Sequence, residues 1–96
     1  MSPKNLKKLA LLRKKIDFLD NRMFEIIVKR THVVQQVLTL KKSKREIIDR
    51  SRIKKVLQKI RKKSKVKKID TKVTSRIWKN MIWSYINYEK KNFKKK

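Results

Sequence analysis

The sequence contains no cysteine and no glycine, only one proline (Pro3) and one histidine (His32), and seven acidic residues among 96. Without cysteine the chain can form neither a disulfide nor a thiolate metal site. A single histidine argues against a His-based metal centre or catalytic triad. Hairpins and tight turns usually need glycine, proline or similar residues, whereas helix interiors do not. The sequence therefore predicts an all-α protein with two short connections.

Long apolar runs are also missing. No stretch approaches the roughly 20 apolar residues of a membrane span. The apolar patch within MSPKNLKKLALLRKK is too short for a signal peptide. We therefore expect a cytoplasmic protein. Its length predicts a single domain over residues 1–96, with a core at about 6–90 and a basic, solvated tail at 91–96.

Positive charge, in contrast, is abundant. The 32 Lys and Arg residues give a formal net charge of +25. Such a field attracts polyanions and small anions alike, so nonspecific nucleic-acid affinity is expected at low salt. A basic nucleic-acid-binding helical dimer without catalysis is therefore one alternative function. No helix-turn-helix or zinc pattern supports it, and Trp78, Trp83, Tyr85 and Tyr88 have a helical spacing that is more typical of core residues.

Apolar periodicity predicts three helices. Apolar residues recur at steps of three and four from about Leu6 to Leu40, which indicates one helix of about 50 Å. A second helix is expected from about Asp49 to Lys63, with Asp49 as its N-cap, and a third begins near Asp70, which also suits an N-cap. Two short helices cannot cover the whole apolar face of the long one. We therefore expect an intertwined helical homodimer.

Some cations occupy positions where a charge is unfavourable. Arg30 interrupts the apolar face of the long helix, where burial requires a partner. Lys41 lies three turns later on the same face, about 16 Å along the axis. Arg13 precedes Arg30 by about 25 Å and could join them only from the partner chain of an antiparallel dimer. Arginine forks match carboxylates, so these cations predict a dicarboxylate pocket. Residues of the other two helices complete it: Arg52, Tyr85 and Glu89.

Four stretches carry a family likeness: LLRKKIDFLDNRMFEIIVKR, the lysine of TLKK, IIDRSRIKKVL and IWKNMIWSYINYE. The leading motif consists of Leu12, Arg13, Ile16, Asp17 and Asp20. With these features the chain resembles the all-helical, type II chorismate mutase superfamily over about residues 6–90. The resemblance implies a homodimer with two active sites. Each would rearrange the dianion chorismate to prephenate, in aromatic amino-acid biosynthesis, without a metal or cofactor.

The resemblance also implies roles for individual residues. It assigns substrate binding to Arg13 of the partner chain, Arg30, Lys41, Asp49 and Arg52. Lys41 would contact a carboxylate and the ether oxygen of the breaking bond, and Glu89 stands where the family has Gln or Glu facing that oxygen. Lys41 and Glu89 are thus the predicted catalytic pair. A carboxyl must be protonated to donate a hydrogen bond, so activity is expected to rise as the pH falls.

Two substrate-binding positions depart from the usual mutase. Ile53 follows Arg52 where mutases typically place a Glu that binds the substrate's hydroxyl, and Tyr85 stands where they often have Ser or Thr. Both changes resemble the isochorismate pyruvate-lyases. Those enzymes share the fold and convert isochorismate to salicylate and pyruvate in another pericyclic reaction. A lyase is therefore the main alternative to a chorismate mutase.

Overall fold

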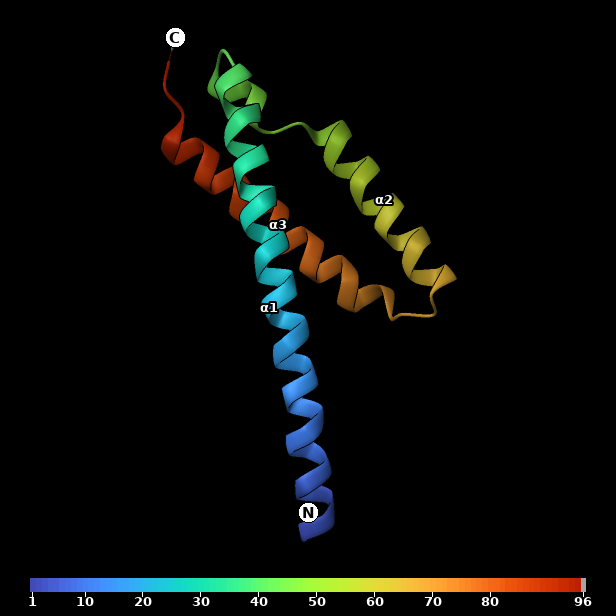
Figure 1. Cartoon of the computed structure of the whole chain (residues 1–96). Helices are drawn as coiled ribbons and strands as arrows, with labels where there is room; N and C mark the ends of the chain where they lie inside the picture. The colour runs from blue at the N-terminus through green and yellow to red at the C-terminus, as the bar shows by residue number, and fades with distance from the viewer. Residues whose placement is uncertain (96) are drawn as a thin grey trace. The chain divides into compact units, whose positions relative to one another are not determined.

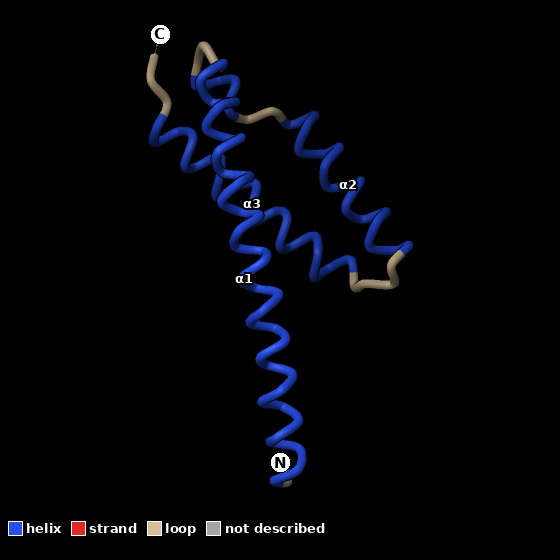
Figure 2. The backbone as a smooth tube through the Cα atoms, in the orientation of Figure 1, coloured by secondary structure: helices blue, strands red, loops and turns tan. Residues whose placement is uncertain are grey.

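The computed structural model describes residues 1–95, and it confirms the predicted all-α class. No strand occurs in that part of the chain (Figure 2). Its helices are labelled in Figure 1, with the short 3-10 helix η1 preceding α2: α1 (Pro3–Leu40), η1 (Lys44–Ile47), α2 (Arg50–Val66) and α3 (Thr71–Asn92). None of them is long and apolar enough to cross a membrane.

The chain divides into two compact units, Met1–Val34 and Gln35–Lys96. The first unit is the N-terminal part of α1. This helix begins at Pro3, three residues earlier than predicted, because Ser2 caps it: the Asn5 backbone N donates to Ser2 Oγ at 3.2 Å. Proline is well suited to the first helical position, since its missing N–H has no helical partner there.

The apolar face of α1 has no cover within this unit. No residue of α1 is buried, and eleven large apolar side chains of its first 34 residues are exposed. They are Leu6, Leu11, Leu12, Ile16, Phe18, Leu19, Met23, Phe24, Ile26, Ile27 and Val33. An exposed apolar face of this extent is typical of an interaction surface.

The second unit is built around a hairpin of α2 and α3, which run side by side in opposite directions (Figure 1). Each helix has an aspartate cap: Asp49 Oδ1 accepts from the Arg52 backbone N at 3.0 Å, and Asp70 Oδ1 accepts from that of Lys72 at 2.9 Å. Both caps were predicted. η1 packs against α3, and Ile47 and Ile86 are the two buried apolar residues among those described.

The turn between α2 and α3 forms without glycine. α2 continues to Val66, three residues beyond its predicted end, and Lys68 then takes the left-handed conformation, with φ 57°. The backbone N–H groups of Lys68 and Ile69 donate to the carbonyls of Lys65 and Ser64, at 3.2 and 2.9 Å. This is a Schellman motif with lysine at the position that usually holds glycine.

A buried hydroxyl pair ties the two helices together next to this turn. Ser64 is 4% exposed, and its Oγ donates to the Ile60 carbonyl at 2.7 Å. The same atom lies 2.7 Å from Thr74 Oγ1 on α3. At the other end, the predicted tail at 91–96 begins inside α3, which continues to Asn92. Its last residue, Lys96, lies outside the described residues.

Candidate active site

Lys41 and Glu89, 48 residues apart in the chain, form a salt bridge. Lys41 follows the last residue of α1, and its backbone N donates to the Leu38 carbonyl at 3.2 Å. Glu89 lies in the last turns of α3. The distance from Lys41 Nζ to Glu89 Oε1 is 3.1 Å, and the two side chains are 17% and 8% exposed. The structure thus brings together the two residues predicted to act in catalysis; their catalytic role stays a prediction.

The burial of this pair has an energetic consequence. A carboxylate in a poorly solvated position is stable when a cation and a hydrogen bond replace the lost water. Lys41 provides both, because its ammonium makes a charge-assisted hydrogen bond to Glu89. Glu89 in turn holds the Lys41 ammonium at one point next to α3. A cation fixed in this way is ready for a developing negative charge without further rearrangement.

A cavity of about 780 Å³ adjoins the pair, between the end of α1 and the start of α2. It is lined by Lys41, Arg45, Glu46, Ile48, Asp49 and Arg50. Asp49 is engaged in capping α2, and Glu46 Oε1 accepts a hydrogen bond from the Lys42 backbone N at 3.2 Å. The cavity thus has three cations and two acids, and each acid already accepts a hydrogen bond from a backbone N–H. The excess of positive charge makes the cavity suited to an anion.

The other predicted site residues of the second unit lie on α2 and α3. Arg52 is exposed in the first turn of α2. Tyr85 is half-buried on α3, one turn before Glu89. Ile53 is half-buried and lines a different cavity, in the groove between α2 and α3. The roles predicted for these three residues stay predictions.

Arg13 and Arg30 belong to the first unit, Met1–Val34. Arg13 is exposed, and Arg30 is half-buried within α1. Their convergence with Lys41 stays a prediction. His32 is exposed as well. Within residues 1–95, no three His, Asp or Glu side chains are grouped so that they could hold a metal ion.

One contact next to the site was not predicted. Gln35 Nε2, near the end of α1, donates to Tyr88 Oη on α3 at 3.0 Å. With the Lys41–Glu89 pair, this bond fixes the last turns of α1 to the end of α3 at two points. The only signal in the sequence was the position of Tyr88, directly before Glu89. Because residues 35 and 88 are 53 apart, helical periodicity could not link them.

Comparison with known proteins gives a family match over most of the chain. The sequence model of a family described as chorismate mutase type II matches residues 12–90. That range contains every residue predicted for the site, from Arg13 to Glu89. No curated protein and no solved structure matches the chain.

Proposed function

The chain belongs to the chorismate mutase type II family, and we propose that it rearranges chorismate to prephenate. The observation that carries this proposal is the Lys41–Glu89 pair, 3.1 Å apart, mostly buried and beside a cationic cavity. The rearrangement breaks one ether C–O bond and forms one C–C bond within the same molecule. Nothing is added or removed, so the reaction requires no nucleophile, metal or cofactor.

Such a reaction needs two things from the protein. The substrate must be held in the compact conformer in which the two ends of the new bond meet. Positive charge or donors must face the ether oxygen, which becomes negative as its bond breaks. Lys41 donates to that oxygen, and Glu89, when protonated, provides a second donor beside it. Arg30, Arg52 and Arg13 of a partner chain hold the two carboxylates.

The partner is a second copy of the chain. The exposed apolar face of α1 supports this proposal, because covering each such side chain contributes about 1.5–3 kcal/mol. A twofold dimer in which the two α1 helices run antiparallel covers both faces at once and places Arg13 of each chain at the other's site. Each site is then completed by the dimer, and the two units of each chain act as one domain.

A turnover assay with matched variants tests the reaction. We expect purified protein to convert chorismate to prephenate, followed by loss of chorismate absorbance and by product chromatography. Lys41→Met should lower kcat by about 10²–10³, the usual effect of removing a donor to a developing oxyanion. Lys42→Met removes the same charge from the neighbouring exposed residue and should leave kcat unchanged. Equal activity of the two variants would exclude Lys41 as the catalytic donor.

A mixing experiment tests the shared site. Arg13→Ala and Lys41→Met should each be inactive as homodimers. Unfolding and refolding them together at equal amounts makes about half of the dimers heterodimers, and each of these has one intact site. About a quarter of wild-type turnover should therefore return. No recovery, from a mixture shown to contain heterodimers, would mean that Arg13 acts within its own chain.

Isochorismate pyruvate-lyase activity is the second candidate. It is favoured by Ile53, a half-buried apolar residue where a mutase would bind the substrate's hydroxyl with a carboxylate, and by the half-buried aromatic ring of Tyr85. Parallel assays, one with chorismate and one with isochorismate, distinguish the two activities by their products. Salicylate and pyruvate with little prephenate would make the protein a lyase, whereas prephenate alone would show that a mutase tolerates Ile53.

A further inference from the structure

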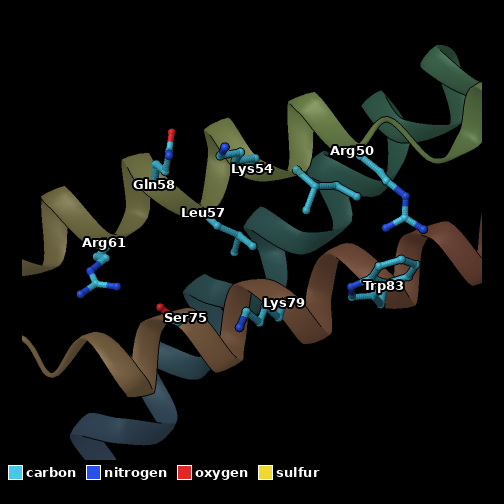
Figure 3. Close-up of a pocket in the computed structure, with 9 residues that line it drawn as sticks. Arg50, Lys54, Leu57, Gln58, Arg61, Ser75, Lys79 and Trp83 are labelled. Carbon is cyan, nitrogen blue, oxygen red and sulfur yellow. The ribbon is translucent and has the colours of Figure 1, made fainter.

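A basic groove lies between α2 and α3, with a volume of about 420 Å³ and nine lining residues (Figure 3). We call it the α2–α3 groove. Four of the nine are cations: Arg50, Lys54, Arg61 and Lys79. None of the nine is acidic, and neither Lys41 nor Glu89 is among them. The groove shares Arg50 with the cationic cavity and Ile53 with the predicted substrate site, but its other three cations, Lys54, Arg61 and Lys79, belong to neither.

The groove has cations at its edges and an apolar centre. In Figure 3, Arg50 and Arg61 extend from α2 toward α3, with Leu57 between them. Lys79 and Trp83 line the opposite wall on α3 (Figure 3). Residues 50 to 61 of α2 span about 16 Å at 1.5 Å per residue. That is the length of about five stacked nucleotides at 3.4 Å per nucleotide.

Trp83 is the most informative residue of this groove. Its spacing in the sequence is typical of a core residue, but 38% of it is exposed, so the expectation of a core position is wrong for this ring. A partly exposed aromatic ring that lines a groove with lysines and arginines offers a stacking surface beside positive charge. Proteins that bind single-stranded nucleic acid combine these two elements, a positive groove and aromatic rings on which bases stack.

The extent of the charge favours a long ligand over a compact one. The cations of the groove are spread along it, since Arg50 and Arg61 are 11 residues apart, about 16 Å along α2. A small anion would neutralise the cations at one end only. We propose that the α2–α3 groove binds single-stranded nucleic acid, with phosphates on its cations and one base stacked on the Trp83 ring. This proposal does not rest on the proposed mutase reaction, although Arg50 and Ile53 border both surfaces.

A pair of charge-matched variants of the full chain tests the location. The groove variant carries Lys54→Gln, Arg61→Gln and Lys79→Gln, and the control carries Lys55→Gln, Lys59→Gln and Lys62→Gln. Both lose three positive charges, so the general attraction falls equally. Binding of a fluorescein-labelled oligothymidylate of about 15 nucleotides, within the site sizes known for such proteins, is measured by anisotropy from low to high salt.

The expected result follows from counterion release. Each phosphate contact to a single strand contributes about −0.7 to the slope of log K against log salt. The groove variant should therefore lose about 2 units of slope and bind on the order of 100-fold more weakly at 0.1 M salt. The control should change by less than about tenfold. Equal losses in the two variants would show attraction by net charge alone and would overturn the proposal.

A second variant tests the stacking. Trp83→Leu keeps an apolar side chain but removes the aromatic face, and should weaken binding about 5- to 150-fold, since a stacked base contributes about 1–3 kcal/mol. Trp83→Phe, which keeps a ring, should retain most of the affinity. Circular dichroism checks that all variants are folded. Polyglutamate that competes as well per charge as the oligonucleotide would also overturn the proposal, because it has no bases to stack.

Chorismate turnover, measured on the same samples, separates the two proposals. Lys54, Arg61 and Lys79 have no part in the proposed reaction, so the groove variant should keep wild-type turnover. Loss of nucleic-acid binding with intact turnover is the expected pattern. An active mutase that shows no salt-dependent binding by the groove would overturn the groove proposal and leave the mutase proposal untouched.

Discussion

The Lys41–Glu89 pair predicts that stability and activity respond differently to the same changes. Lys41→Met leaves Glu89, only 8% exposed, without its cation; Glu89→Leu leaves an ammonium that is 17% exposed without its anion. Removing one member of a buried pair typically lowers the free energy of unfolding by 3–5 kcal/mol, because a charge stays buried without compensation. Replacing both members by apolar residues of similar size is often neutral or stabilising.

We therefore expect each single variant to lose about 3 kcal/mol or more and the double variant to return to within about 1 kcal/mol of wild type. Urea unfolding followed by far-UV circular dichroism measures this, at one protein concentration for all samples, because the stability of the proposed dimer would depend on concentration. Turnover should be lost in all three variants. Single variants that lose less than about 1 kcal/mol would show that water screens the pair, and the reasoning from burial would then be wrong.

Three further predictions concern the pH response and the α2–α3 turn. Wild-type turnover should rise as the pH falls, because only a protonated Glu89 donates to the ether oxygen; Glu89→Gln donates at every pH and should give a flat profile. Lys68→Gly should raise the free energy of unfolding by about 0.5–1 kcal/mol, because φ 57° is unfavourable for a side chain with a Cβ. Ser64→Ala should lower it by about 1–3 kcal/mol, since the hydroxyl bonds to Ile60 and Thr74 are lost in a buried position.

Each of these has a contrary outcome. If wild type and Glu89→Gln had the same pH–rate profile, the pH dependence of turnover would not come from protonation of Glu89. If Lys68→Gly lowers the free energy of unfolding instead, the Lys68 side chain stabilises the fold by more than its left-handed backbone conformation destabilises it. For residue 64, the control is Ser51→Ala, an exposed serine in the first turn of α2 that should change stability little. Equal effects at residues 51 and 64 would contradict the role given to the buried hydroxyl.

The helices could be predicted from the sequence because apolar periodicity and the two aspartate caps are local signals. Their ends were less certain where the signal was unusual. α2 ends with Lys68 in a conformation that glycine normally adopts, so no glycine marked its end. η1, at Lys44–Ile47, is a single 3-10 turn and is too short to show a period. The burial of Ile47 depends on its packing against α3, which no local pattern encodes.

The site depends on contacts that are distant in sequence. Helical spacing placed Glu89 on α3, but its pairing with Lys41, 48 residues away, followed from family resemblance. Gln35 and Tyr88 had no such guide and were missed. The exposure of Trp83 was missed as well, because a tryptophan at helical spacing gives the same pattern whether its ring lies in a core or lines a groove.

If the proposed dimer forms the sites, the uncovered apolar face of α1 makes the amount of active protein depend on how strongly the gene is expressed. If the sites form only when two chains meet, the number of sites rises with the square of chain concentration while chains are scarce, and linearly once most have paired. A dilute assay would then understate the activity of the same protein in a crowded cell. Newly made chains would also depend on finding each other before their apolar faces meet other surfaces, so translation from one message by several ribosomes would favour assembly.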